Sequence, residues 1–217
     1  TTIVQALKAL VSEGKKVLVA APSNKAVIVI LEKYFGKYGS VDGKKLKYFG
    51  REEKIATLAQ CPELLKGKTN LVAESLQDVC NAKVVFSTLN RSYLLKKAFS
   101  PDAVIVDEAG QSKISETMIP LTLTPKSLLL VGDHKQLPPT VKDRRVIEDG
   151  GDKSLLSYLI NDRQAEKHDF REGYRMDPEI NRWPSRYVYD GELYANFTPT
   201  VMSPHASQAL LHCLPPY

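Results

Sequence analysis

Two short apolar runs that end abruptly in acidic residues constrain the fold more than any other feature of this chain. The run Ala103–Val106 stops at the pair Asp107-Glu108. The run Leu128–Val131 likewise stops at Gly132-Asp133. Continuous apolar runs of this length are typical of strands buried on both faces of a sheet, and polar residues at the carboxyl ends of such strands lie where open α/β sheets bind ligands. The two runs therefore predict a shared site at one edge of a sheet.

Helical and strand patterns alternate along the first part of the chain. Apolar residues in Ile3–Val11 recur at helical spacing, and Lys25–Tyr34 shows a similar pattern. Lys16–Ala21 and Lys83–Thr88 read as strands, each followed by polar residues. Strands that alternate with helices pair in parallel through right-handed crossovers. We therefore expect an α/β fold, with a parallel sheet covered by helices on both faces.

We divide the chain into two domains. Residues 1–165 form the first, which carries a short and less regular insertion at about 36–80. Residues 166–217 hold the beginning of the second. Asn161–Lys167 reads as a polar surface connection between them.

The second domain begins with a clear helix signal. Asp177-Pro178 predicts a helix start, since Asp is a favoured N-cap and Pro suits the first turn. Pro184 is expected to kink or restart this helix, because it lacks an N–H and clashes with the preceding turn. The apolar run Ala209–Leu214 reads as a further strand.

Composition favours an intracellular protein, cytoplasmic or nuclear, that does not cross a membrane. No apolar stretch approaches the roughly 18 residues that a membrane-spanning helix needs. The cysteines Cys61, Cys80 and Cys213 are far apart and odd in number, so they indicate neither a disulfide framework nor a zinc site. The net charge of +5 and the pI of about 9.0 favour polyanionic partners without requiring them.

The residues at the two strand ends suit nucleotide hydrolysis. In an acidic pair after a buried strand, Asp107 can hold Mg²⁺ while Glu108 orients or deprotonates a water molecule. Gln136, in the turn after the second run, places an amide near the same edge, where it can sense a terminal phosphate or a water molecule. Taken singly, each segment also fits a solvated loop. The pairing of the two segments favours the catalytic interpretation.

Three ordered segments resemble successive motifs of superfamily 1 helicases, in particular the nonsense-mediated-decay and senataxin-like group. They are Val106–Gln111, Gly132–Pro139 and Tyr174–Ile180. Two further segments are similar to the motifs of that group known as Ia and Ib. These are Ala21–Val27 and Phe86–Leu89. The resemblance runs nearly from end to end of the chain, in order and at consistent spacing.

The resemblance implies a P-loop NTPase with two RecA-like domains that clamp ATP and Mg²⁺ and move along single-stranded RNA or DNA. Asp107 then binds the metal and Glu108 activates the water. Gln136 contacts the γ-phosphate. Arg175 reaches the terminal phosphates from the second domain as an arginine finger does, and Tyr174 beside it stacks on the adenine base.

Loops at the strand ends are candidates for binding the nucleic acid. Their hydroxyl, amide and backbone N–H groups can hold phosphates without reading sequence. Capping of the next helix uses the same geometry and is compatible with this role. The residues assigned to this interface are Pro22, Ser23, Asn24, Ser87, Thr88 and Pro139.

The chain also departs from the family pattern. The Gly-rich loop that ends in Gly-Lys-Thr is absent, and we expect it immediately before Thr1 in a longer protein. Without that loop, this segment alone is expected to be inactive as an ATPase. Gly173 and Asp177 stand where the group usually has Gln and His. The leading hypothesis is the partial motor core of an ATP-dependent helicase. The alternative is a catalytically inactive helicase-like scaffold that binds nucleic acid or protein.

Overall fold

The structure, a computed structural model, describes residues 2–38, 46–51, 53–54, 71–73 and 75–196. The chain forms two compact units, Thr1–Ala165 and Glu166–Tyr217. Most of the sequence-predicted insertion and the strand predicted at 209–214 lie outside the described residues. No helix among the described residues is long and apolar enough to span a membrane.

A five-stranded parallel sheet forms the centre of the first unit. Its strands lie in the order β2-β3-β1-β4-β5, so the crossovers return to the sheet on both sides of β1. This arrangement confirms the prediction of an α/β fold with a parallel sheet. The strands are β1 Val17–Ala21, β2 Leu46–Tyr48, β3 Val84–Thr88, β4 Ala103–Val106 and β5 Ser127–Leu130.

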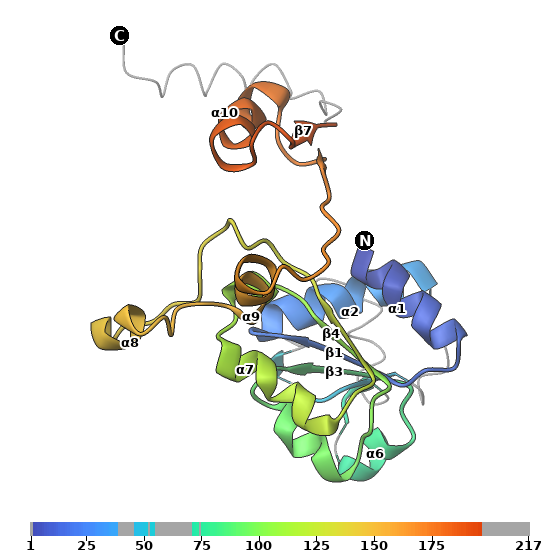
Figure 1. Ribbon diagram of the computed structural model, residues 1–217. Coiled ribbons are helices and arrows are strands. Elements are labelled where there is room, and N and C mark those ends of the chain that lie inside the picture. Colours follow the sequence, from blue (N-terminus) through green and yellow to red (C-terminus); the bar gives the residue numbers. More distant parts are fainter. Residues whose placement is uncertain (1, 39–45, 52, 55–70, 74, 197–217) are drawn as a thin grey trace. The chain divides into compact units, whose positions relative to one another are not determined.

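Helices cover both faces of this sheet (Figure 1). On one face, α1 Thr2–Ser12 and α2 Asn24–Tyr38 pack over a core that includes Leu7, Leu31 and Phe86. On the other, Val79, Leu95 and Leu123 close a second core against the sheet. The helical segments that contribute to or surround this second core are α6 Leu76–Cys80, η1 Ser92–Lys97, η2 Ala109–Gln111, α7 Ile114–Met118, η3 Pro120–Leu123, α9 Leu155–Ser157 and η4 Tyr158–Asp162.

Local signals set the ends of the first two helices. The helix α1 ends before Gly14, whose φ of +78° is a left-handed conformation that glycine adopts without strain. The helix α2 begins where the Ser23 Oγ accepts a hydrogen bond from the Ala26 N–H at 3.2 Å. Ser23 therefore positions the loop that follows β1.

The two apolar runs differ in burial. All four residues of β4 are buried, as the sequence predicts. The prediction is wrong for β5, which lies at the edge of the sheet and alternates between exposed and partly buried residues, with Leu129 39% exposed. An edge strand lacks a neighbour on one side, and this position is not visible in its local sequence.

One helix was not predicted. The stretch after β5 contains α8 Arg144–Glu148, which has no buried residue. Asp143 caps it, because its Oδ1 accepts a hydrogen bond from the Arg145 N–H at 2.9 Å. A helix without a buried face carries no apolar periodicity, so the sequence pattern could not reveal it.

The second unit pairs two short strands around one helix. The strands β6 Glu172–Gly173 and β7 Tyr194–Ala195 pair in parallel. Between them, α10 Pro178–Val188 begins at Asp177, whose Oδ1 accepts from the Glu179 N–H at 2.9 Å, so the predicted cap is confirmed. The helix continues through Pro184, so the predicted restart at that residue is wrong, while the predicted kink stays a prediction.

Candidate active site

Backbone hydrogen bonds align the loops at the carboxyl edge of the sheet. The Asp107 N–H donates to the Ala20 carbonyl at 2.9 Å, and the Val131 N–H donates to the Val106 carbonyl at 2.8 Å. Beyond the strands, the Ala109 N–H donates back to the Val131 carbonyl at 2.9 Å. The loops that follow β4 and β5 therefore leave the sheet side by side.

Two glycines let these loops touch through their backbones. A Cβ atom at Gly110 would lie 2.4 Å from the Asp133 carbonyl oxygen. A Cβ atom at Gly132 would lie 2.8 Å from the Gly110 nitrogen. Both distances are far inside van der Waals contact, so the packing requires residues without a side chain. The structure thus brings the loop of Asp107-Glu108 against the loop of Gly132-Asp133.

Asp107 is a half-buried carboxylate at this edge. Its burial raises the pKa of the carboxyl group, and a hydrogen bond from the Glu108 backbone and the charge of Lys33 act in the opposite direction. A poorly hydrated carboxylate gains from a cation, and Mg²⁺ is usually held by one or two carboxylates together with water and substrate phosphates. No group of three or more metal-binding side chains occurs among the described residues. A magnesium ion here would therefore be held by Asp107 together with water and substrate phosphates.

Glu108 has an unusual backbone conformation. Its φ of 53° and ψ of 36° lie in the left-handed region, which costs a non-glycine residue about 1–3 kcal/mol. Its carbonyl accepts hydrogen bonds from the Gln111 N–H at 2.9 Å and from the Ser112 hydroxyl at 3.3 Å, and these contacts hold the turn. The side chain is exposed at the edge. Such held conformations concentrate at active sites.

Gln136 lies in a turn that Asp133 organises. The Asp133 Oδ1 accepts from the Lys135 N–H at 2.9 Å, while its Oδ2 accepts from the Gln136 Nε2 at 3.1 Å. Gln136 is exposed, and this hydrogen bond orients its amide group. The structure therefore places the amide on the loop that touches the acidic pair.

The loops after β1 and β3 also lie together. Ala21 and Thr88 are in register, and the Leu89 N–H donates to the Ala21 carbonyl at 3.0 Å. Ser87 is fully buried, and its hydroxyl lies 3.2 Å from both the Phe49 and the Thr88 carbonyl oxygens. The Ser87 hydroxyl thus points into the protein, which corrects the expectation that it is presented to a phosphate. Pro139 is also buried.

Tyr174 and Arg175 belong to the second unit, and both are exposed. The Tyr174 hydroxyl donates to Glu172, and the Tyr194 hydroxyl donates to the same carboxylate at 3.2 Å. These hydrogen bonds, that of Tyr174 first, lower the pKa of Glu172. They also hold the Tyr174 side chain in place. The residue is 66% exposed, so its ring can serve as a platform for stacking.

The sequence interpretation missed three residues that support the loops. The Tyr48 hydroxyl donates to the Asn24 Oδ1 at 3.0 Å, and the Arg91 guanidinium carbon lies 4.9 Å from the centre of the Phe49 ring. The signal available was an aromatic pair at the end of a strand pattern. Its partners are 24 and 42 positions away, obtained as 48 − 24 and 91 − 49, so local patterns could not pair them.

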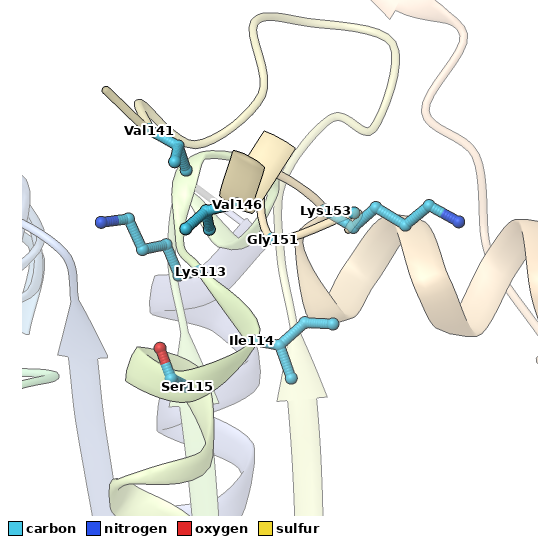
Figure 2. Close-up of a pocket in the computed structure, with 8 residues that line it drawn as sticks. Lys113, Ile114, Ser115, Val141, Val146, Gly151 and Lys153 are labelled. Carbon is cyan, nitrogen blue, oxygen red and sulfur yellow. The ribbon is translucent and has the colours of Figure 1, made fainter. Parts of the chain in front are cut away.

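A separate, mostly apolar hollow lies elsewhere in the first unit. Lys113, Ile114, Val146 and Lys153 contribute to its wall, as Figure 2 shows. None of the predicted site residues lines it. The candidate active site lies instead at the carboxyl ends of β4 and β5.

Comparisons with known proteins agree with the motifs. Residues 63–144 match a family described as AAA domain. The probable helicase senataxin of Mus musculus is 33% identical over 71% of this chain and 7% of its own length. The DNA replication ATP-dependent helicase/nuclease dna2 of Schizosaccharomyces pombe is 32% identical over 89% of this chain and 14% of its own length. The regulator of nonsense transcripts 1 homolog of Neurospora crassa is 38% identical over 44% of this chain and 9% of its own length.

The chain therefore spans no more than about a seventh of these three relatives. Among solved structures, the Pif1 helicase from Candida albicans matches 98% of this chain and 60% of its own chain at 14% identity, with a TM-score of 0.25, too low to bear on the fold. The matches to curated relatives support a helicase-type domain. They confirm that the chain resembles superfamily 1 helicases of the nonsense-mediated-decay and senataxin-like group.

Proposed function

We propose that this chain carries part of the motor of an ATP-dependent helicase, which hydrolyses ATP, moves along single-stranded RNA or DNA and unwinds duplexes. The observation that supports this most is the backbone packing of Gly110 against Asp133, because it unites the acidic pair and the amide residue at one sheet edge. The helicases among the relatives support the same function.

In this proposal Asp107 holds Mg²⁺, directly or through water. Because its carboxylate is half-buried at the end of β4, a bound cation would stabilise its ionised form. Bound Mg²⁺ neutralises negative charge on the transferred phosphoryl group.

Glu108 and Gln136 act on the attacking water and the terminal phosphate. The Glu108 side chain is exposed on a turn whose carbonyl contacts keep it in place, so it can orient a water molecule and accept its proton. The Gln136 amide, oriented by Asp133, can contact the γ-phosphate or the same water.

The second unit supplies charge and a stacking surface. Arg175 stabilises negative charge at the terminal phosphates, and Tyr174 stacks on the adenine base. We assign the nucleic acid to Pro22, Ser23, Asn24 and Thr88, and we give the two buried residues of the expected interface, Ser87 and Pro139, the role of bracing their loops.

The test is ATP turnover by the complete protein with and without single-stranded RNA and DNA of matched length. We expect turnover that depends on Mg²⁺ and is stimulated by at least one of the two strands. Binding of nucleic acid without any turnover would contradict the motor and support the scaffold. The ratio of stimulation by RNA to that by DNA identifies the preferred strand.

A further inference from the structure

Arg91 carries a positive charge that no carboxylate in the described part of the chain pairs. Its Nε is buried and has no hydrogen-bond partner, and no carboxylate of the described residues lies within ion-pair distance of its guanidinium. A partly buried charge without a partner is costly, so it favours any anion that reaches it. The side chain is half-buried, so part of it remains open to solvent.

Phe49 supports the Arg91 guanidinium. The Arg91 Cζ lies 4.9 Å from the Phe49 ring centre, within the range of a cation–π contact. Phe49 is itself fixed, because it is 7% exposed and its N–H donates to the Phe86 carbonyl at 2.7 Å. A guanidinium held on a rigid ring keeps its flat fork of donors in one orientation.

The segment Tyr48-Phe49, which supports Arg91, also contacts both loops assigned to nucleic acid. Tyr48, next to Phe49, donates to Asn24 in the loop after β1. The Arg91 N–H donates to the Thr88 carbonyl at 3.1 Å in the loop after β3. The Arg91 backbone is thus held in the loop after β3, and Phe49, whose ring supports the guanidinium, adjoins the residue that contacts the loop after β1.

We propose that Arg91 binds a backbone phosphate of the single-stranded nucleic acid and that Phe49 is the positioning residue that orients it. This inference rests on the proposed nucleic-acid binding. A phosphate is the fitting ligand because the guanidinium fork matches two phosphate oxygens at once. Such a contact strengthens binding without selecting a base.

The test is the affinity of the 217-residue chain for a fluorescent single-stranded RNA, and for the DNA of the same sequence, across a series of salt concentrations. One phosphate contact contributes about 0.7 to the slope of log affinity against log salt for single strands. We expect Arg91→Ala to reduce the slope by about that amount, and Arg91→Lys to restore the slope without the full affinity. Lys126→Ala is the matched control, since it removes one positive charge from an exposed side chain beside Asp102, before β4.

A double-mutant cycle tests the role of Phe49. Phe49→Leu is expected to weaken binding in the parent chain and to have no further effect beside Arg91→Ala. Thermal unfolding of each variant verifies that the chain is folded. Equal slopes for Arg91→Ala and the parent chain, or equal effects of Phe49→Leu in both backgrounds, would overturn the inference alone. Failure of the parent chain to bind either strand would overturn the proposed nucleic-acid function as well.

Discussion

Two aspartates flank the same strand, and their environments are opposite. Before β4, Asp102 accepts a hydrogen bond from the Lys16 N–H at 2.9 Å and lies 3.6 Å from the Lys126 ammonium. The Lys16 hydrogen bond is the main reason that the pKa of Asp102 is lowered. After β4, burial raises the pKa of Asp107.

This difference gives Asp102 a structural role before β4 and Asp107 a chemical role after it. Asp102 has its partners within the chain and ties β1 to the segment that leads into β5. Asp107 pays a desolvation cost that the chain only partly offsets. A half-buried carboxylate with a raised pKa at the end of a strand is a candidate for a functional site.

Replacement of each aspartate by asparagine tests the difference between the two ends of β4 and has the larger expected effect. Asp107→Asn removes the proposed metal ligand, and a metal supplies several kcal/mol of transition-state stabilisation, so ATP turnover by the complete protein should fall by at least about 100-fold. Asp102→Asn should leave the turnover of the folded protein within about twofold. Steady-state kinetics at saturating ATP decides between these outcomes, and comparable losses for the two variants would erase the distinction.

Glycine replacement tests the packing of the two loops. Gly110→Ala places a Cβ atom against the Asp133 carbonyl, so the loops must separate and turnover should fall by about tenfold or more. Gly36→Ala in α2 is the matched control, because nothing lies within 4 Å of its Cβ position. That control should leave turnover unchanged and stabilise the helix by about 0.5–1 kcal/mol. Kinetics and thermal unfolding of both variants provide the measurement, and unchanged turnover in Gly110→Ala would show that the contact is dispensable.

The smallest effect concerns the pH dependence of stability. Since the folded pKa of Asp102 is lower than its ordinary value of 3.8, the ionised group stabilises the fold above that pH. The contribution disappears as the pH falls through the folded pKa. The melting temperature of Asp102→Asn should therefore lie below that of the parent near neutral pH and approach it in acid. A constant difference across this range would contradict the assigned hydrogen bond.

The sequence predicted most of the fold because its strands are short apolar runs with polar ends. Burial of β5 could not be predicted in this way, since exposure at a sheet edge depends on which strands lie beside it. The helix α8 was missed because it buries no residue. The helix α10 also continues through Pro184, despite the local tendency of proline to interrupt a helix.

The candidate site was predictable only in part. Asp107, Glu108 and Gln136 stand in recognisable motifs, and the structure brings their loops together. Arg91 and Phe49 stand in no such motif. Their role depends on a contact between residues 42 positions apart (91 − 49), which no local pattern predicts. The inward direction of the Ser87 hydroxyl likewise depends on the neighbouring strand.

The most direct test of the proposed ATP site is Glu108→Gln in the complete protein. This change keeps the size of the side chain and removes its ability to accept a proton. Strand-stimulated ATP turnover should fall by about 10²–10⁴-fold, the usual contribution of a general base, while nucleotide binding by equilibrium titration stays within about twofold. Turnover equal to that of the parent protein would contradict the assignment of Glu108 and, with it, the carboxyl edge of this sheet as the site of hydrolysis.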